Sequence, residues 1–185
     1  LRETEKLVWF KKPKIVIKKN ENNHYAWFPD GQLNLYENCI SNNLKKRQNK
    51  TAIITVNQNK EIRKYSFAQI DKKVNKIANY IKKISTNKKL RIMIHASASL
   101  ESAVLMFTCA KLGLHFSVIF EELESLGIQN RIKLFKPNIF FSRLSEKIFI
   151  SKMGFKSYNK IKFIYGEQLK KIIDTKENAK KVKNK

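Results

Sequence analysis

The residue types that most often perform chemistry are few in this chain and do not group into a catalytic site. The sequence holds three histidines and two cysteines among 185 residues. Cys39 and Cys109 lie far apart, without the CxxC spacing or the nearby histidine pair that zinc ligation requires. We therefore predict no metal centre, and we interpret both cysteines as buried, reduced thiols of a cytoplasmic protein.

One pair of residues has the composition of a nucleophile and its base. His115 and Ser117 are two positions apart in an apolar run that predicts a strand, so their side chains share one face. No third group that would orient the histidine is visible in the sequence. We predict that both residues serve in strand packing, and we assign no catalytic residue.

Phosphate chemistry usually needs a glycine-rich loop, and this sequence has none. It contains five widely separated glycines. A loop that cradles phosphates with backbone N–H groups needs glycines close together. The sequence therefore predicts that the chain does not bind a nucleoside triphosphate by such a loop.

The net charge of +24 predicts attraction to nucleic acid or to anionic surfaces when it is taken alone. However, 33 of the basic residues are lysine and only 6 are arginine, and asparagine and isoleucine are also abundant. AT-rich codons encode lysine, asparagine and isoleucine, so compositional drift accounts for this profile. Because arginine makes bidentate phosphate contacts and is not enriched, we rank a nucleic-acid-binding protein last among the functions considered. No window reaches the ~20 apolar residues of a membrane span, and the first residues do not form a secretory signal.

The elements that would position a site begin with an extended lead-in. Residues 1–23 alternate basic and short apolar pieces, and His24–Ile40 combines aromatic residues with a Pro-Asp-Gly turn signal. Thr51–Val56 and Arg63–Ser66 predict a strand hairpin. Ser66 is a plausible N-cap for the amphipathic helix that follows.

Three apolar strands and two helices then alternate. The strands are expected at Leu90–His95, His115–Phe120 and Asn138–Ser142, with helices at Ser99–Gly113 and Glu121–Lys136. Short connections in this order are typical of right-handed βαβ crossovers. The predicted fold class is α/β, a partial doubly wound parallel sheet with crossover helices, preceded by an extended aromatic-rich segment. The last ten residues are too polar to form a core element.

The segment Arg91–Ile132 reads RIMIHASASLESAVLMFTCAKLGLHFSVIFEELESLGIQNRI and resembles, without a gap, a pattern of the acetyl- and propionyl-CoA synthetase family. Upstream, WFPDGQLN at Trp27–Asn34 resembles the family's "WF-GG-LN", and Trp9 with Lys12-Pro13 resembles "W-KP". The similarity runs from about Trp9 to Ser142. The matched residues in the main segment are Arg91, Glu101, Ala103, Val104, Met106, Cys109, Ala110, Gly113, Ser117, Val118, Phe120, Arg131 and Ile132.

The resemblance implies an AMP-forming ligase that activates a short carboxylate with ATP and passes the acyl group to coenzyme A. It divides the chain into residues 1–50 as a family N-terminal segment, 51–145 as the first part of the adenylation domain, and 146–185 as a weakly matched basic segment. The family uses ATP, Mg and CoA, whereas we expect this chain alone to bind none of them. In the family, the ATP-binding and catalytic motifs come after the part that this chain matches, so we expect an inactive fragment.

Departures from the pattern concern the coenzyme A side. In the family, two glycines follow the residue matched by Phe120 and lie close to the CoA nucleotide, but here they are Glu121 and Glu122. Two carboxylates would repel a phosphate, although negative charges also suit the start of a helix, which is the interpretation we prefer. Phe120 and Arg143 are the candidate CoA-side residues. Trp27 and Phe28 are expected to anchor the lead-in to the body.

Two alternatives to an inactive fragment remain open. The chain is either a retained binding or regulatory module or one half of a split synthetase. The implied partners are the remainder of the synthetase or a second copy, with no membrane. An uncovered sheet face is expected to expose Val118, Phe120, Ile139 and Phe141.

Overall fold

Four parallel strands form the central sheet in this computed structural model, which describes residues 2–87, 89–156, 158 and 160–174. They are β7 (Arg91–His95), β8 (His115–Ile119), β9 (Ile139–Ser142) and β10 (Lys162–Ile164), in the order β10-β9-β7-β8. Arg91 lies opposite His115, and Ile92 lies opposite Ile139. The predicted parallel pairing of the first three strands is therefore confirmed.

The two predicted crossover helices are present, and one begins later than expected. Helix α3 (Leu100–Leu112) has a capping box at Ser99 and ends at Gly113, whose φ of 64° is left-handed. Helix α4 spans Ser125–Phe135. The prediction that Glu121 begins this helix is wrong, because its carboxylate is held by Ser97 and Arg143, which follow β7 and β9, and the chain turns before Ser125.

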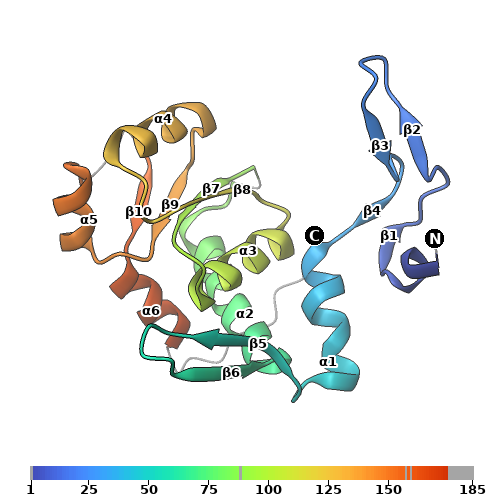
Figure 1. Ribbon diagram of the computed structural model, residues 1–185, viewed down its shortest axis with the longest axis horizontal. Coiled ribbons are helices and arrows are strands. Elements are labelled where there is room, and N and C mark those ends of the chain that lie inside the picture. The colour runs from blue at the N-terminus through green and yellow to red at the C-terminus, as the bar shows by residue number, and fades with distance from the viewer. Residues whose placement is uncertain (1, 88, 157, 159, 175–185) are drawn as a thin grey trace.

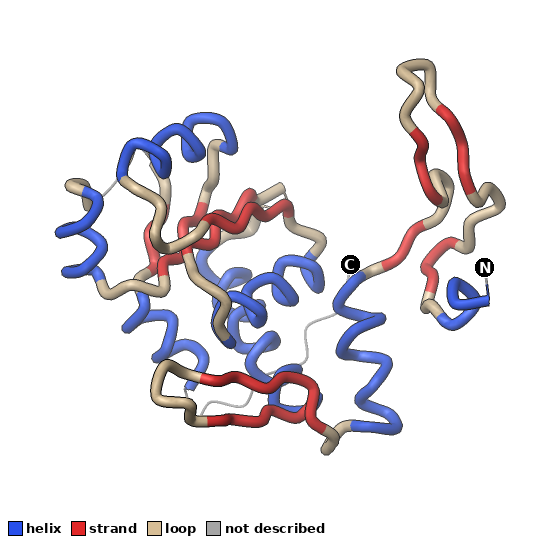
Figure 2. The backbone as a smooth tube through the Cα atoms, viewed as in Figure 1, coloured by secondary structure: helices blue, strands red, loops and turns tan. Residues whose placement is uncertain are grey.

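Helices cover both faces of the sheet (Figures 1 and 2). One apolar core joins the sheet to α3, to α2 (Phe67–Ile84) and to α6 (Gly166–Asp174). A second core joins the other face to α4 and to α5 (Glu146–Met153). Cover on both faces explains why the strand sequences are almost continuously apolar. No helix within the described ranges is long and apolar enough to cross a membrane.

The segment that follows β9 changes one expectation about exposed apolar surface. It supplies α5, the edge strand β10 and α6, none of which the sequence analysis assigned. Ile139 and Phe141 are consequently buried rather than exposed. Val118 and Phe120, at the opposite edge of the sheet, are exposed as predicted, and Phe120 keeps 76% of its surface. The prediction for the last ten residues falls outside the described part of the chain.

The lead-in forms small strand pairs that project from the rest of the molecule (Figure 1). A 3₁₀ turn at Arg2–Lys6 precedes β1 (Trp9–Lys11), which pairs with β4 (Gln32–Leu33); β2 (Ile17–Lys19) pairs with β3 (Tyr25–Trp27). Trp27 is 64% exposed, and its ring contacts the ring of Phe28. Phe28 packs against Trp9 with 5.6 Å between the ring centroids. The expectation that Trp27 and Phe28 anchor the lead-in to the body is therefore wrong, because Trp27 is largely exposed and Phe28 packs on Trp9 and Trp27 within the lead-in.

Two helical segments and the predicted hairpin complete the body. A π-helical turn at Glu37–Ser41 continues into α1 (Asn42–Arg47), and β5 (Thr51–Val56) pairs antiparallel with β6 (Ile62–Ser66). Ser66 caps α2 in a capping box with Gln69, as predicted. Cys109 is buried, but Cys39 is exposed because Tyr36 and Ile40 take the buried positions of its turn; both thiols are free.

A buried polar cluster fastens the lead-in to the body. Lys111 is 4% exposed, and its Nζ donates to Tyr36 Oη at 3.0 Å and lies 3.9 Å from Asp71. The Tyr36 hydroxyl in turn donates to the Asp71 carboxylate. Burial, together with Asp71, raises the pKa of Tyr36 well above its usual range. Each buried charge therefore has a partner, which the cost of an isolated buried ion demands.

Tyr36→Phe is expected to lower the free energy of unfolding by roughly 1–3 kcal/mol, because Lys111 and Asp71 lose the hydroxyl that joins them. Urea unfolding followed by circular dichroism measures the change. Tyr25→Phe is the matched control, since Tyr25 is 63% exposed. Equal stability of the two variants would contradict a joining role for Tyr36.

Candidate functional site

The carboxyl edge of the sheet is where the topology predicts a ligand site. From β7 the chain crosses to β8 on one side, whereas from β9 it crosses to β10 on the other side. The loops after β7 and β9 therefore diverge, and ligands of doubly wound proteins bind in the crevice at such a switch point. Ser97 follows β7 and Arg143 follows β9, so these two residues flank the switch point.

A carboxylate from the third strand end lies between them. Arg143 Nε donates to Glu121 Oε2 at 2.7 Å, and Nη2 donates to Oε1 at 2.8 Å, a bidentate pair. Ser97 donates to the same Oε2 from its hydroxyl at 2.9 Å and from its backbone N–H at 3.3 Å. The Glu121 carboxylate thus accepts four hydrogen bonds at the edge of the sheet.

This environment favours the charged form of Glu121. Burial alone would raise its pKa, but the hydrogen bonds from Arg143 and Ser97 outweigh burial and hold the pKa below the ordinary value of 4.5. A carboxyl whose pKa is lower in the folded state stabilises the fold above its unfolded pKa, and the contribution is lost as pH falls through the folded value. At neutral pH the Glu121 carboxylate is therefore ionised and stays bound to Arg143.

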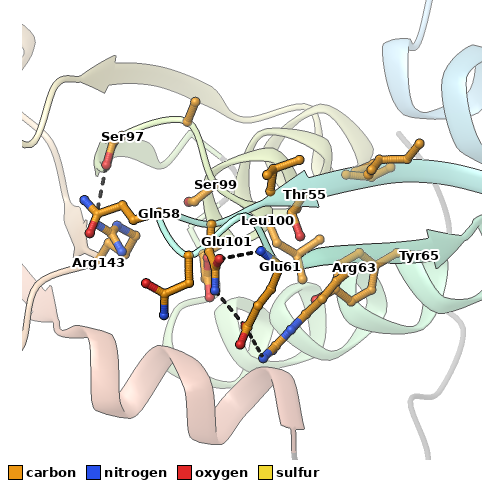
Figure 3. Close-up of a pocket in the computed structure, with 16 residues that line it drawn as sticks. Thr55, Gln58, Glu61, Arg63, Tyr65, Ser97, Ser99, Leu100, Glu101 and Arg143 are labelled. Carbon is orange, nitrogen blue, oxygen red and sulfur yellow. Dashed lines mark hydrogen bonds and ion pairs between the residues drawn. The ribbon is translucent and has the colours of Figure 1, made fainter.

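A cavity of about 800 Å³ opens beside this corner. Ile54 and Val56 of the hairpin β5–β6 line it. Figure 3 shows Ser97 and Arg143 at the end away from Thr55. The cavity also carries Glu61, Arg63 and Glu101. Arg63 lies 3.7 Å from Glu61 and Arg143 is bound to Glu121, so both arginines that line the cavity face a carboxylate.

The backbone of Arg143 is held from two sides. Its N–H donates to the carbonyl of His95 at 3.0 Å, which continues the pairing of β9 with β7. On the other side, a Cβ at Gly166 would overlap the Arg143 carbonyl oxygen, so only glycine permits this approach. The start of α6 therefore helps to fix where the guanidinium emerges.

His95 is a buried titratable group whose backbone carbonyl accepts from Arg143. It is fully buried between Phe140 and Phe149, with Nδ1 3.0 Å from Ser142 Oγ. Its Nε2 has no hydrogen-bond partner in the part of the chain that the structure describes. Burial lowers the pKa of His95 below 6.5, and the negative charge of Glu121 offsets this only in part. The imidazole is therefore neutral at neutral pH.

The structure brings the two sequence-predicted CoA-side residues into one corner. Phe120 is exposed and directly precedes Glu121, which binds Arg143. Sequence reasoning missed Ser97 as a partner and treated Glu121 as a helix start. The available signal is that each residue lies two positions after the end of an apolar strand. His115 lies at the amino end of β8, and Ser117 lies in its middle, so neither reaches this edge. Among the described residues, no three His, Cys, Asp or Glu side chains gather as a metal site.

The fold is a doubly wound α/β sheet with polar groups at its switch point, the place where proteins of this class bind ligands. Comparisons with known proteins make this more specific. Residues 40–184 match the family "AMP-binding enzyme", and residues 2–39 match "Acetyl-coenzyme A synthetase N-terminus". The chain belongs to the AMP-binding enzyme family.

Similar proteins are much longer than this chain. The acetyl-coenzyme A synthetase of Helicobacter pylori (strain P12) is 30% identical over 69% of this chain and 20% of that protein. That of Methylobacillus flagellatus is 32% identical over 63% of this chain and 18% of that protein. The solved acetoacetyl-CoA synthetase from Streptomyces lividans superposes on 96% of this chain and 30% of its own length, with a TM-score of 0.72 at 12% identity. The chain spans about a fifth of the length of the curated relatives it matches.

The free energy of unfolding is expected to fall as the pH is lowered through 6.5, because the unfolded chain then binds a proton that folded His95 refuses. Urea titrations from about pH 8 to about pH 5 measure the slope. His95→Asn keeps a group near the Nδ1 position and should flatten this slope. The exposed residues His24 and His115 provide matched controls as asparagine variants, and a flat wild-type profile would contradict the prediction.

Proposed function

We propose that this chain is the amino-terminal portion of an AMP-forming ligase that activates a short carboxylic acid such as acetate or propionate, and that it makes no acyl-adenylate alone. The observation that carries the proposal is the pair of consecutive family matches, an acetyl-coenzyme A synthetase N-terminus at 2–39 followed by an AMP-binding enzyme at 40–184. Adenylation requires phosphates, a magnesium ion and a carboxylate to be held together. The widely spaced glycines of this sequence support no phosphate-cradling loop for that task.

In the complete enzyme we propose that Phe120 and Arg143 face coenzyme A, while ATP and Mg are bound by later segments. The corner around Phe120 does not fit a phosphate as it stands. Glu121 already neutralises the Arg143 guanidinium, and the exposed Glu122 adds a second negative charge. A phosphate of coenzyme A therefore meets no free Arg143 guanidinium at this corner.

A split synthetase is the second candidate, in which the exposed apolar strands would be the surface that a separate catalytic portion covers. Tyr25 and Trp27 are 63% and 64% exposed on one face of the projecting ribbon β2–β3, and Ile54, Val56 and Ile62 are exposed on β5–β6. Two-stranded ribbons are marginal in water without cover. A polypeptide homologous to the remaining four-fifths of the relatives would supply such cover, and association with a second copy of this chain is the competing arrangement.

The purified chain with ATP, Mg²⁺ and acetate is expected to release no pyrophosphate above a control without enzyme, because the groups that position and stabilise the transfer are absent. Adding the complementary portion of the H. pylori synthetase, made without its first fifth, distinguishes the candidates. Restored acetate-dependent release would support a split enzyme, whereas binding without release would support a regulatory module. Release by the chain alone would overturn the proposal.

A further inference from the structure

The hydrogen bonds at the switch point converge on one place from two strand ends. Ser97, after β7, supplies its hydroxyl and backbone N–H, and Arg143, after β9, supplies Nε and Nη2. Arg143 Nη2 also lies 3.4 Å from Ser97 Oγ, so the donors touch one another as well as the acceptor. The acceptor, Glu121, comes from the loop after β8 and is 7% exposed. Donors and acceptor thus come from different elements.

We propose that Ser97 and Arg143 form a carboxylate-binding cradle at the topological switch point, and that the chain keeps this cradle filled with its own Glu121. The position agrees with the general location of ligands in doubly wound sheets. The donor set agrees as well, because a guanidinium fork with an added hydroxyl and N–H is complementary to a planar two-oxygen anion. The adjoining cavity gives the cradle access to solvent.

The self-occupied cradle acts as a specificity device in the proposed ligase. A phosphate or carboxylate group that approaches this corner must displace Glu121 from four hydrogen bonds and pass the exposed Glu122. Solution anions therefore do not occupy the cradle at neutral pH. This consequence for coenzyme A rests on the proposed function, whereas the cradle itself does not.

Replacing the tethered carboxylate by a free one tests the cradle. Glu121→Ala removes the group CH₂–COO⁻, which has the size and charge of acetate. Acetate should therefore bind Glu121→Ala saturably and raise its melting temperature by about 3 °C or more at tenfold the dissociation constant. The Nε–H resonance of Arg143, one of six arginines in the chain, should shift in parallel. The wild-type chain should show neither effect.

Three controls separate this cradle from a merely structural ion pair. Three variants should show no acetate effect. In Glu122→Ala the cradle is still occupied by Glu121, and in Glu121→Gln it is filled by a neutral isostere. In Glu121→Ala/Arg143→Gln the cradle lacks its guanidinium. Acetamide, which is neutral, should not replace acetate. Chloride at matched ionic strength corrects for screening. Inorganic phosphate in a parallel titration tells whether the cradle prefers a planar carboxylate to a tetrahedral anion; equal or tighter phosphate binding would overturn the assigned carboxylate preference.

Instability of Glu121→Ala does not prevent the test. Refolding yields with sodium acetate and with sodium chloride then give the readout, and acetate-dependent recovery supports the cradle. Equal yields, or identical acetate effects on Glu121→Ala and on the double variant, would overturn it. None of these measurements uses ligase activity, so their failure leaves the proposed function standing, and pyrophosphate release by the chain alone would leave the cradle standing.

Discussion

The register of β7 between β8 and β9 determines where every group of the candidate site lies. Parallel pairing sets His95 beside Ile119 and Ser142, so the residues that follow these three strands emerge at one edge. A slip of one residue would move each side chain of β7 to the opposite face of the sheet, into a core that does not fit it, and would separate Ser97 from Arg143. Cover by helices on both faces makes such a slip costly, because Ile92, Met93 and Ile94 are all fully buried.

The lead-in depends on a different kind of constraint. Its aromatic residues pack on one another, and its connection to the body passes through groups that are polar and buried. Asn34 donates to the carbonyl of Ala110 at 2.7 Å, close to the Lys111 that binds Tyr36. A polar connection of this kind specifies one geometry, since a displaced Lys111 would be a buried charge without a partner. The projecting ribbon is thereby held at a fixed point, although most of its own surface is exposed.

Sequence patterns predicted the parts of the fold that depend on local periodicity. Ser66, Ser99 and Gly113 are recognisable as caps because their chemistry acts within one turn. The strand β10 escaped prediction because only three residues form it and its pairing with β9 is entirely long-range. Glu121 was misassigned for a related reason. Its loop favours a helix start by local rules, but two partners more than twenty residues away in sequence outweigh them.

The unusual charge of the chain gives the Glu121–Arg143 pair its significance. With 39 basic and 15 acidic residues, a site that presents arginine to solvent would attract many anions. A tethered carboxylate competes at a high effective concentration because its approach costs little translational freedom, whereas a dissolved anion pays that cost in full. Asp71 and Lys111 form a second contact of this kind, and there both side chains are mostly buried. At both sites an acidic side chain pairs with a cation that is buried or half-buried. Without that partner, Arg143 would bind dissolved anions indiscriminately and Lys111 would destabilise the fold. The net positive charge is therefore carried by the surface lysines.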